Sequence, residues 1–194
     1  MKLYVIRHGE SEANAGKFFS GWAPVALTPK GEDDARAAGE LIRHIPFDKV
    51  YSSDIRRVIQ TQQLALPDAD CERTPLIREY NVGSLMGKNL QDCAETMGEA
   101  FLKNRAAFDF TPYGGESNDM VDARVAEFMR MLEQTDYENV AVFSHAGTIR
   151  SIIDYVLGVR TPRNATILLN GAVSVFEFIE DHWRILMLNY TKEL

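Results

Sequence analysis

Compact apolar runs of strand type are spaced along this chain, at residues 2–6, 48–52, 139–144, 173–179 and 184–190. The run at 139–144 is almost continuously apolar, which is typical of a strand covered on both faces of a sheet. The last two runs are separated by Glu180-Asp181-His182, and this short polar interval predicts a hairpin turn.

Between these runs, apolar residues recur every three or four positions, which is the spacing of a helix with one buried face. Four helices are predicted in this way: one capped by Thr28 with Pro29 at its first position, one carrying Ile55 to Leu66, one beginning near Ser117, and one following Gly147. The alternation of strands and helices predicts an α/β fold, a three-layer sandwich with a mostly parallel central sheet flanked by helices.

The segment from about 86 to 116 is the least regular part of the chain. It predicts a helix around 91–108, followed by the turn-forming stretch 111–115. We interpret it as a short lid-like insertion. Because the sequence shows no repeat, low-complexity tract or long linker, residues 1–194 are predicted to form one domain.

Composition adds that the chain is globular, with 45% hydrophobic and 25% charged residues. No apolar run approaches the roughly 20 residues that span a bilayer, and the first run is too short for the core of a signal peptide. Without a secretion signal, Cys71 and Cys93 are expected to be free thiols in a reducing cytoplasm. The net charge of −7 argues against nucleic acid and against membrane as partners.

Two histidines occupy matched positions in the pattern. His8 follows the first strand and His145 follows the third, each beside arginine or small residues. Ligands of open α/β sheets bind outside the carboxyl ends of the strands, and the helix after Gly147 would direct its positive end toward an anion there. Arg57 comes from a third strand end. The residues alone leave a structural role for the histidines about as well supported as a functional one.

Zinc is the competing functional interpretation of two histidines. The chain has neither H-x-x-x-H nor C-x-x-C spacing, and Arg7 beside His8 would repel a cation. An arginine next to a histidine indicates a bound phosphate instead. We therefore expect no metal and no cofactor.

At this point the residues resemble a known family. The stretch Arg7-His8-Gly9-Glu10 with Asn14 is similar to the R-H-G-E/T-x-x-x-N signature of the histidine phosphatase superfamily, the phosphoglycerate-mutase-like enzymes. Further stretches resemble the family in its order along nearly the whole chain, at 27–31, 52–61, 76–87, 114–117 and 144–150. The resemblance implies a phosphoglycerate-mutase-like fold and a reaction that proceeds through phosphohistidine.

The resemblance also implies roles for individual residues. His8 would be the nucleophile, and Arg7, Arg57 and His145 would surround the oxygens of the transferred group. Glu79 would act as general acid and later as the base that activates water. The remaining residues implied at the phosphate and substrate are Asn14, Ser20, Gly21 and Ala146. Planar arginine forks and a neutral imidazole are the groups that such a transfer needs.

The substrate is less closely defined. Residues 21–28 lack the aspartate of many family members, and 83–87 read Gly-Ser-Leu-Met-Gly where many phosphatases have G-x-W-E-G. The leading hypothesis is a metal-independent phosphatase, a phosphoric monoester hydrolase acting on a small phosphorylated metabolite. A cofactor-dependent phosphoglycerate mutase and a non-catalytic phospho-ligand binding module are the alternatives. The sequence leaves open whether the chain acts alone or as a homodimer.

Overall fold

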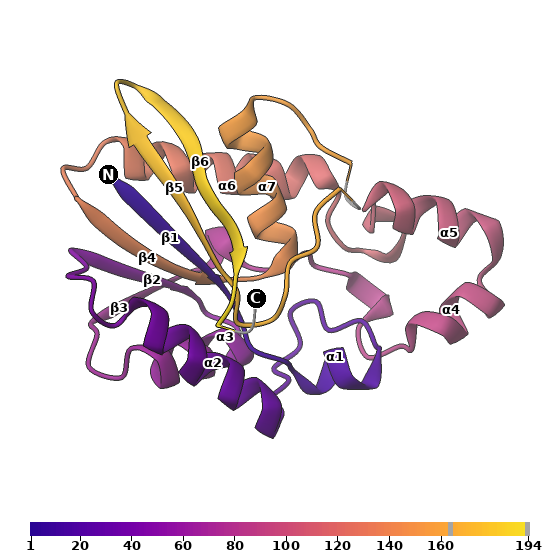
Figure 1. Ribbon diagram of the computed structural model, residues 1–194. Coiled ribbons are helices and arrows are strands. Elements are labelled where there is room, and N and C mark those ends of the chain that lie inside the picture. The colour runs from indigo at the N-terminus through magenta and orange to yellow at the C-terminus, as the bar shows by residue number, and fades with distance from the viewer. Residues whose placement is uncertain (163–164, 193–194) are drawn as a thin grey trace.

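The computed structural model describes residues 1–162 and 165–192. In this part of the chain six strands form one sheet, in the order β3-β2-β4-β1-β5-β6 (Figure 1). In chain order the strands are β1 Lys2–Arg7, β2 Lys49–Ser53, β3 Cys71–Thr74, β4 Asn139–Ser144, β5 Val173–Ile179 and β6 His182–Tyr190. Strands β3, β2, β4 and β1 pair in parallel, whereas β5 is antiparallel to both β1 and β6. The mostly parallel sheet predicted from the sequence is confirmed.

Helices cover both faces of this sheet. They are α1 Glu12–Gly16, α2 Pro29–Ile42, α3 Arg56–Ala65, α4 Leu90–Thr96, α5 Gly98–Ala107, α6 Asn118–Glu133 and α7 Ala146–Leu157. Short 3-10 turns lie at Pro75–Ile77, Gly83–Leu85 and Thr111–Tyr113. Helices α2 and α3 pack on one face with Ile6, and α6 and α7 pack on the other with Leu3 and Val5 (Figure 1). Alternate residues of β1 thus enter opposite cores, which gives the predicted three-layer α/β sandwich.

Local signals in the sequence account for the helix starts. The side chain of Thr28 accepts from the Gly31 backbone N–H to cap α2, and the side chain of Ser117 caps α6 in the same way through Met120 N–H. At α7 the cap position is His145, in extended conformation, and Ala146 is the first helical residue. The start of α7 therefore places His145, one of the two candidate histidines, at the positive end of a helix.

The predicted strands need two corrections. Strand β3 was not expected, because its four residues are largely exposed and polar and show no apolar alternation. The expected turn at 180–182 is shorter than predicted. Glu180 and Asp181 alone make the turn, both with positive φ (50° and 61°), so His182 is the first residue of β6.

The predicted helices need two corrections as well. The single helix expected around 91–108 is wrong: α4 ends at Thr96 and α5 begins at Gly98, whose φ of 72° interrupts the helical path. Helix α1 was not expected, because five residues are too few to show a periodicity. It is fixed by a capping box in which the Ser11 and Asn14 side chains each bond to the other's backbone N–H. In Figure 1, α4 and α5 project beyond the sheet as the insertion.

Two expectations from composition can be compared with the structure. Cys71, half-buried, and Cys93, buried, are both free thiols. None of the helices in the described ranges combines the length and the apolar character that crossing a bilayer requires.

Candidate active site

Three neighbouring strands bring together the strand ends at which the sequence places His8, His145 and Arg57. Strands β1 and β4 pair in parallel with Arg7 opposite Ser144, so His8 and His145 leave the sheet side by side. The His8 backbone N–H donates to the Ser144 carbonyl at 3.0 Å, and the two imidazole ring centroids are 5.3 Å apart. Strand β2 lies on the other side of β4 and ends at Ser53, four positions before Arg57, which is the second residue of α3.

The hydrogen bonds of His8 define its tautomer. Its Nε2 receives a hydrogen bond from Arg57 Nε at 3.2 Å, and its Nδ1 lies 2.7 Å from the Gly9 carbonyl oxygen. A guanidinium only donates and a carbonyl only accepts, so the lone pair is on Nε2 and the proton on Nδ1. The side chain is almost fully buried. Burial, and then the charges of Arg57 and Arg7, hold the pKa of His8 well below the usual value for histidine. His8 is therefore a neutral imidazole near pH 7, and the lone pair of its Nε2, bound here by Arg57 Nε–H, can attack once Arg57 turns to another acceptor.

Arg57 connects the two histidines. Its Nη2 donates to His145 Nδ1 at 3.0 Å and to the Gly21 carbonyl at 3.0 Å. His145 Nε2 in turn donates to Ser53 Oγ at 2.9 Å. The Arg57 side chain has no exposed surface, and burial lowers its pKa to about 10, with Glu79 opposing the shift. A pKa of about 10 still leaves Arg57 charged near pH 7, so a buried cation lies between two neutral imidazoles.

Arg7 supplies a second cation. Its Nη1 donates to the Leu168 carbonyl, whereas its Nε is buried without a hydrogen-bond partner among the described residues. Burial lowers the pKa of Arg7 to about 10, Glu79 raises it, and Arg150 lowers it further. A buried donor without a partner beside other cations is unfavourable in isolation. A tetrahedral oxyanion would satisfy the donor and offset the repulsion between the arginines.

Glu79 is held at the positive end of α7. Its Oε2 accepts from the Gly147 backbone N–H at 3.3 Å and its Oε1 from the Tyr80 backbone N–H at 3.0 Å. A Cβ added to Gly147 would lie 2.0 Å from Oε1, so only glycine leaves room for the carboxylate here. The charge of Glu79 raises the pKa of both Arg7 and Arg57, which places the carboxylate within electrostatic reach of the two cations.

The other expected substrate-side residues surround this centre less directly. The Asn14 side-chain oxygen accepts from Ser11 and from Asn170 Nδ2, which leaves its NH₂ as the group that could donate to a phosphate. Gly21 contributes its carbonyl to Arg57, in a backbone conformation with φ of 46°. Ser20 and Ala146 are half-buried next to Gly21 and His145. The structure thus brings His8, Arg57, His145, Arg7 and Glu79 together. Of the other four residues, Gly21 contacts Arg57 directly, Asn14 is linked to His8 through Asn170, and Ser20 and Ala146 are chain neighbours of Gly21 and His145.

Sequence reasoning missed several residues that hold the site. Ser53 and Thr61 lie within the stretch 52–61 that was compared with the family, but no role was given to them. Thr61 Oγ1 accepts from the Gly9 backbone N–H at 3.1 Å and donates to the Arg57 carbonyl at 2.8 Å. Asn170 donates to the His8 carbonyl at 3.0 Å from far along the chain, and no motif marks it. Trp22 donates to the Glu79 carbonyl at 2.8 Å, and the Arg78 guanidinium lies 4.6 Å above its ring.

Comparison with known proteins places this arrangement in a family. The chain is 30% identical over 192 residues to a broad-specificity phosphatase of Saccharomyces cerevisiae. This match covers 93% of this chain and 81% of that protein. It is 32% identical over 237 residues to a 2,3-bisphosphoglycerate-dependent phosphoglycerate mutase of Streptococcus gordonii. That match covers 100% of this chain and 97% of the mutase.

A solved structure shows the same fold. The alpha-ribazole phosphatase of Shigella flexneri superposes with a TM-score of 0.88 at 26% identity, over 98% of this chain and 96% of that chain. Residues 3–191 match the model of branch 1 of the histidine phosphatase superfamily, and the chain belongs to this superfamily.

Proposed function

We propose that this protein is a metal-independent phosphatase that hydrolyses a small phosphorylated metabolite through a phosphohistidine intermediate on His8. The observation that carries the proposal is the contact between Arg57 Nε and His8 Nε2, because it holds a neutral, correctly protonated nucleophile against a buried cation. The same guanidinium is then adjacent to any phosphoryl group that His8 attacks.

The chemistry follows from this geometry in two steps. The Arg57 guanidinium turns its Nε–H from His8 Nε2 to a phosphoryl oxygen, and the freed lone pair of Nε2 forms a bond to phosphorus while the P–O bond to the alcohol breaks. The Glu79 carboxyl gives a proton to the departing oxygen. In the second step Glu79 takes a proton from water, whose oxygen attacks phosphorus and breaks the P–N bond to release inorganic phosphate. Arg7 and Arg57 carry the positive charge that stabilises the phosphoryl oxygens in both steps.

The surroundings of the site support hydrolysis over isomerisation. A cavity of about 710 Å³ is lined mainly by apolar side chains, among them Phe19, Phe108, Phe110 and Pro162, and also by the charged side chain of Arg105. Phe19 is two residues from Gly21, whose carbonyl binds Arg57. The cations of the insertion, Lys88, Lys103 and Arg105, are all exposed. An apolar wall suits the organic part of a monoester better than a second phosphate group.

Relatives of about equal identity are named phosphatase and mutase, so identity does not choose between the two reactions. A cofactor-dependent phosphoglycerate mutase with the same nucleophile therefore stays the second candidate. We also propose a cytoplasmic location, because the free thiols Cys71 and Cys93 suit a reducing compartment.

Trapping the intermediate tests the proposal. Rapid acid-free quenching during turnover of a labelled phosphomonoester should yield protein-bound phosphate that is stable in base and labile in acid, as a phosphoramidate is. The label should be absent from His8→Asn and present in His44→Asn, a matched change at an exposed histidine. Phosphate release by His8→Asn near the wild-type rate, without label, would contradict a covalent mechanism on His8.

A further inference from the structure

The segment that carries Glu79 has no regular secondary structure of its own. Residues 78–81 lie between two 3-10 turns, so their carbonyl groups are not paired within a helix or a sheet. Side chains from two helices replace them. Thr148 in α7 donates to the Arg78 carbonyl at 2.7 Å, and Arg124 in α6 donates to the carbonyls of Leu76 at 2.9 Å and Glu79 at 3.0 Å. The position of Glu79 therefore depends on groups far from it in sequence.

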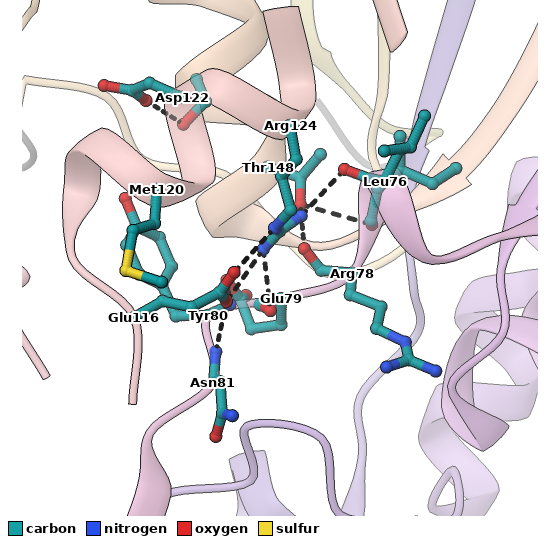
Figure 2. Close-up of polar contacts among 12 residues, drawn as sticks. Leu76, Arg78, Glu79, Tyr80, Asn81, Glu116, Met120, Asp122, Arg124 and Thr148 are labelled. Carbon is teal, nitrogen blue, oxygen red and sulfur yellow. Dashed lines mark hydrogen bonds and ion pairs between the residues drawn. The ribbon is translucent and has the colours of Figure 1, made fainter. Parts of the chain in front are cut away.

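Arg124 makes these contacts as part of an ion pair. Its Nε donates to Glu116 Oε1 at 3.0 Å and its Nη2 to Glu116 Oε2 at 3.3 Å (Figure 2). The side chains are only 14% and 11% exposed, so solvent screens the pair weakly. Glu116 also accepts from the Asn81 backbone N–H at 2.8 Å and donates its own N–H to the Asn81 carbonyl at 2.8 Å. The pair thus binds the segment on both sides of Glu79, at the Leu76 carbonyl before it and at the Asn81 backbone after it.

Resting on the phosphatase function proposed above, we propose that Arg124, held by Glu116, is a positioning residue for the general acid Glu79. Arg124 contacts the Glu79 backbone carbonyl and not its carboxylate. Trp22 Nε1 donates to the same carbonyl at 2.8 Å, so both lone pairs of that oxygen are occupied. With the carbonyl fixed from one side and the carboxylate fixed by Gly147 N–H from the other, Glu79 keeps one orientation in the site.

The fork geometry of Arg124, and not its charge alone, makes this arrangement. One guanidinium satisfies three separate groups, the Leu76 carbonyl, the Glu79 carbonyl and the Glu116 carboxylate. An ammonium is a compact point donor and cannot span the same set. Charge is the competing explanation, because Arg124 also contributes to lowering the pKa of His145. A lysine at position 124 separates the two explanations.

Glu116 also gives the arrangement a link to the insertion. It follows directly on the stretch Thr111–Tyr113 and Gly114-Gly115, and its carbonyl accepts from the Phe110 backbone N–H at 3.0 Å. Phe110 packs edge-on against Tyr80, the residue after Glu79, with ring centroids 5.9 Å apart. A change at Glu116 should therefore disturb the position of Glu79, as a change at Arg124 should.

The experiment compares two substrates that differ in their need for a general acid. We would measure kcat/KM for glycerol 2-phosphate, whose alkoxide is a poor leaving group, and for p-nitrophenyl phosphate, whose nitrophenolate is a good one. The variants are Arg124→Lys, Arg124→Met, Glu116→Gln and Glu79→Gln, with Arg130→Met as the control at an exposed arginine of the same helix. Thermal unfolding of each variant confirms that it is folded at the assay temperature.

We expect Arg124→Lys and Arg124→Met to lose about 100-fold with glycerol 2-phosphate and only about threefold with p-nitrophenyl phosphate, the pattern of a misplaced acid. Glu116→Gln should show a weaker form of the same pattern, and Arg130→Met neither loss. In a Glu79→Gln background, Arg124→Lys should cause no further selective loss. If Arg124→Met does not fold, Arg124→Lys and Glu116→Gln still give the comparison.

Equal losses for both substrates would show a purely structural role and overturn the proposal. Wild-type selectivity in Arg124→Lys would show that charge suffices and would overturn it as well. The proposed function is tested separately in the same series: if the wild type releases no phosphate, the phosphatase function fails. If Glu79→Gln is selective against the poor leaving group and the Arg124 variants are not, only the present inference fails.

Discussion

Arg57 and His8 share one hydrogen bond, from guanidinium Nε to imidazole Nε2 at 3.2 Å, and this bond sets both the tautomer of the nucleophile and the location of the charge it needs. The bond spans 49 positions of sequence and exists because β1 and the β2–α3 connection leave the sheet on either side of β4. A change at Arg57 should therefore affect the nucleophile and the phosphate site together.

Arg57→Lys should keep a positive charge and lose most of the activity. A lysine ammonium cannot contact His8, His145 and the Gly21 carbonyl at once, as the guanidinium does. We expect kcat/KM to fall by about 10²–10³, the effect of removing an oriented donor from a buried site. Steady-state kinetics on a phosphomonoester measure this, with Arg56→Lys, the exposed neighbour, as the control. Similar activity in both variants would mean that charge alone is sufficient at position 57.

The buried histidines should make the free energy of unfolding depend on pH. Burial is the main cause that holds the pKa of His8 and His145 well below the usual value, so the unfolded chain binds protons at these residues at a higher pH than the native state does. Where the unfolded state binds more protons, stability falls as pH falls. The loss should begin near the unfolded pKa of about 6.5 and reach about 1.4 kcal/mol per pH unit for each histidine.

Urea unfolding between pH 7.5 and pH 5 measures this dependence, in a range above the ordinary carboxyl titrations. His8→Gln should reduce the slope by about one histidine's share, whereas His44→Gln at an exposed position should leave it unchanged. A slope that is identical in His8→Gln and the wild type would show that His8 is protonated alike in both states.

Gly147→Ala should impair the acid step selectively. The new Cβ would lie 2.0 Å from Glu79 Oε1 and 2.6 Å from the Tyr80 ring, so the carboxylate has to move. Because alanine in a helix is otherwise favoured over glycine by about 1 kcal/mol, a loss of activity in this variant cannot be attributed to helix propensity. We expect kcat for an alkyl phosphate to fall about 10²-fold and kcat for p-nitrophenyl phosphate to fall much less. Assays of Gly147→Ala and the wild type with both substrates test this prediction. An unchanged kcat for the alkyl phosphate would mean that Glu79 does not act from this position.

Activity should survive removal of metal ions. Arg7 and Arg57, each with a pKa of about 10, keep their charge near pH 7 and occupy the place that a divalent cation takes in other phosphoryl-transfer sites. Dialysis against EDTA followed by assay should leave kcat within about twofold of its starting value. Loss of activity that added zinc or magnesium restores would require a different mechanism.

The sequence was sufficient where the physical cause is local. The apolar runs at 2–6 and 139–144 located the two strand ends, and parallel pairing then made the proximity of His8 and His145 a necessary consequence. The caps Thr28 and Ser117 were equally readable, because an N-cap is a property of a few consecutive residues. The overall α/β class followed from the same local patterns.

The parts that could not be predicted depend on tertiary contacts. Strand β3 is polar and pairs only because β2 offers an edge, and the break before α5 depends on a single glycine conformation at Gly98. Asn170 reaches the His8 carbonyl across 162 positions, and Arg124 reaches the Glu79 carbonyl across 45. No spacing rule encodes such pairs, since they form only after the sheet and its two helical layers have assembled.

The last prediction concerns the fate of the phosphohistidine. A mutase has to hold a doubly phosphorylated acid while it reorients, and has to keep water away from the phosphorylated nucleophile throughout. Here the insertion carries only Lys88, Lys103 and Arg105 as cations, all exposed, and Asp92, Glu95, Glu99 and Asp109 offset them. The cavity that the insertion forms with Phe19 and Pro162 is lined mainly by apolar side chains, and Arg105 is the cation in its wall.

Such an insertion should bind a second phosphate weakly, so water should be the principal acceptor and phosphate release should outrun isomerisation. Incubation with 3-phosphoglycerate and a primer of 2,3-bisphosphoglycerate, with 2-phosphoglycerate and inorganic phosphate measured in the same samples, compares the two rates directly. A Lys88→Ala, Lys103→Ala double variant should leave phosphate release unchanged, because neither side chain lines the cavity of Phe19, Phe108 and Phe110. Isomerisation that exceeds phosphate release, and that this variant abolishes, would instead show that the insertion anchors the bisphosphorylated intermediate and that the enzyme is a mutase.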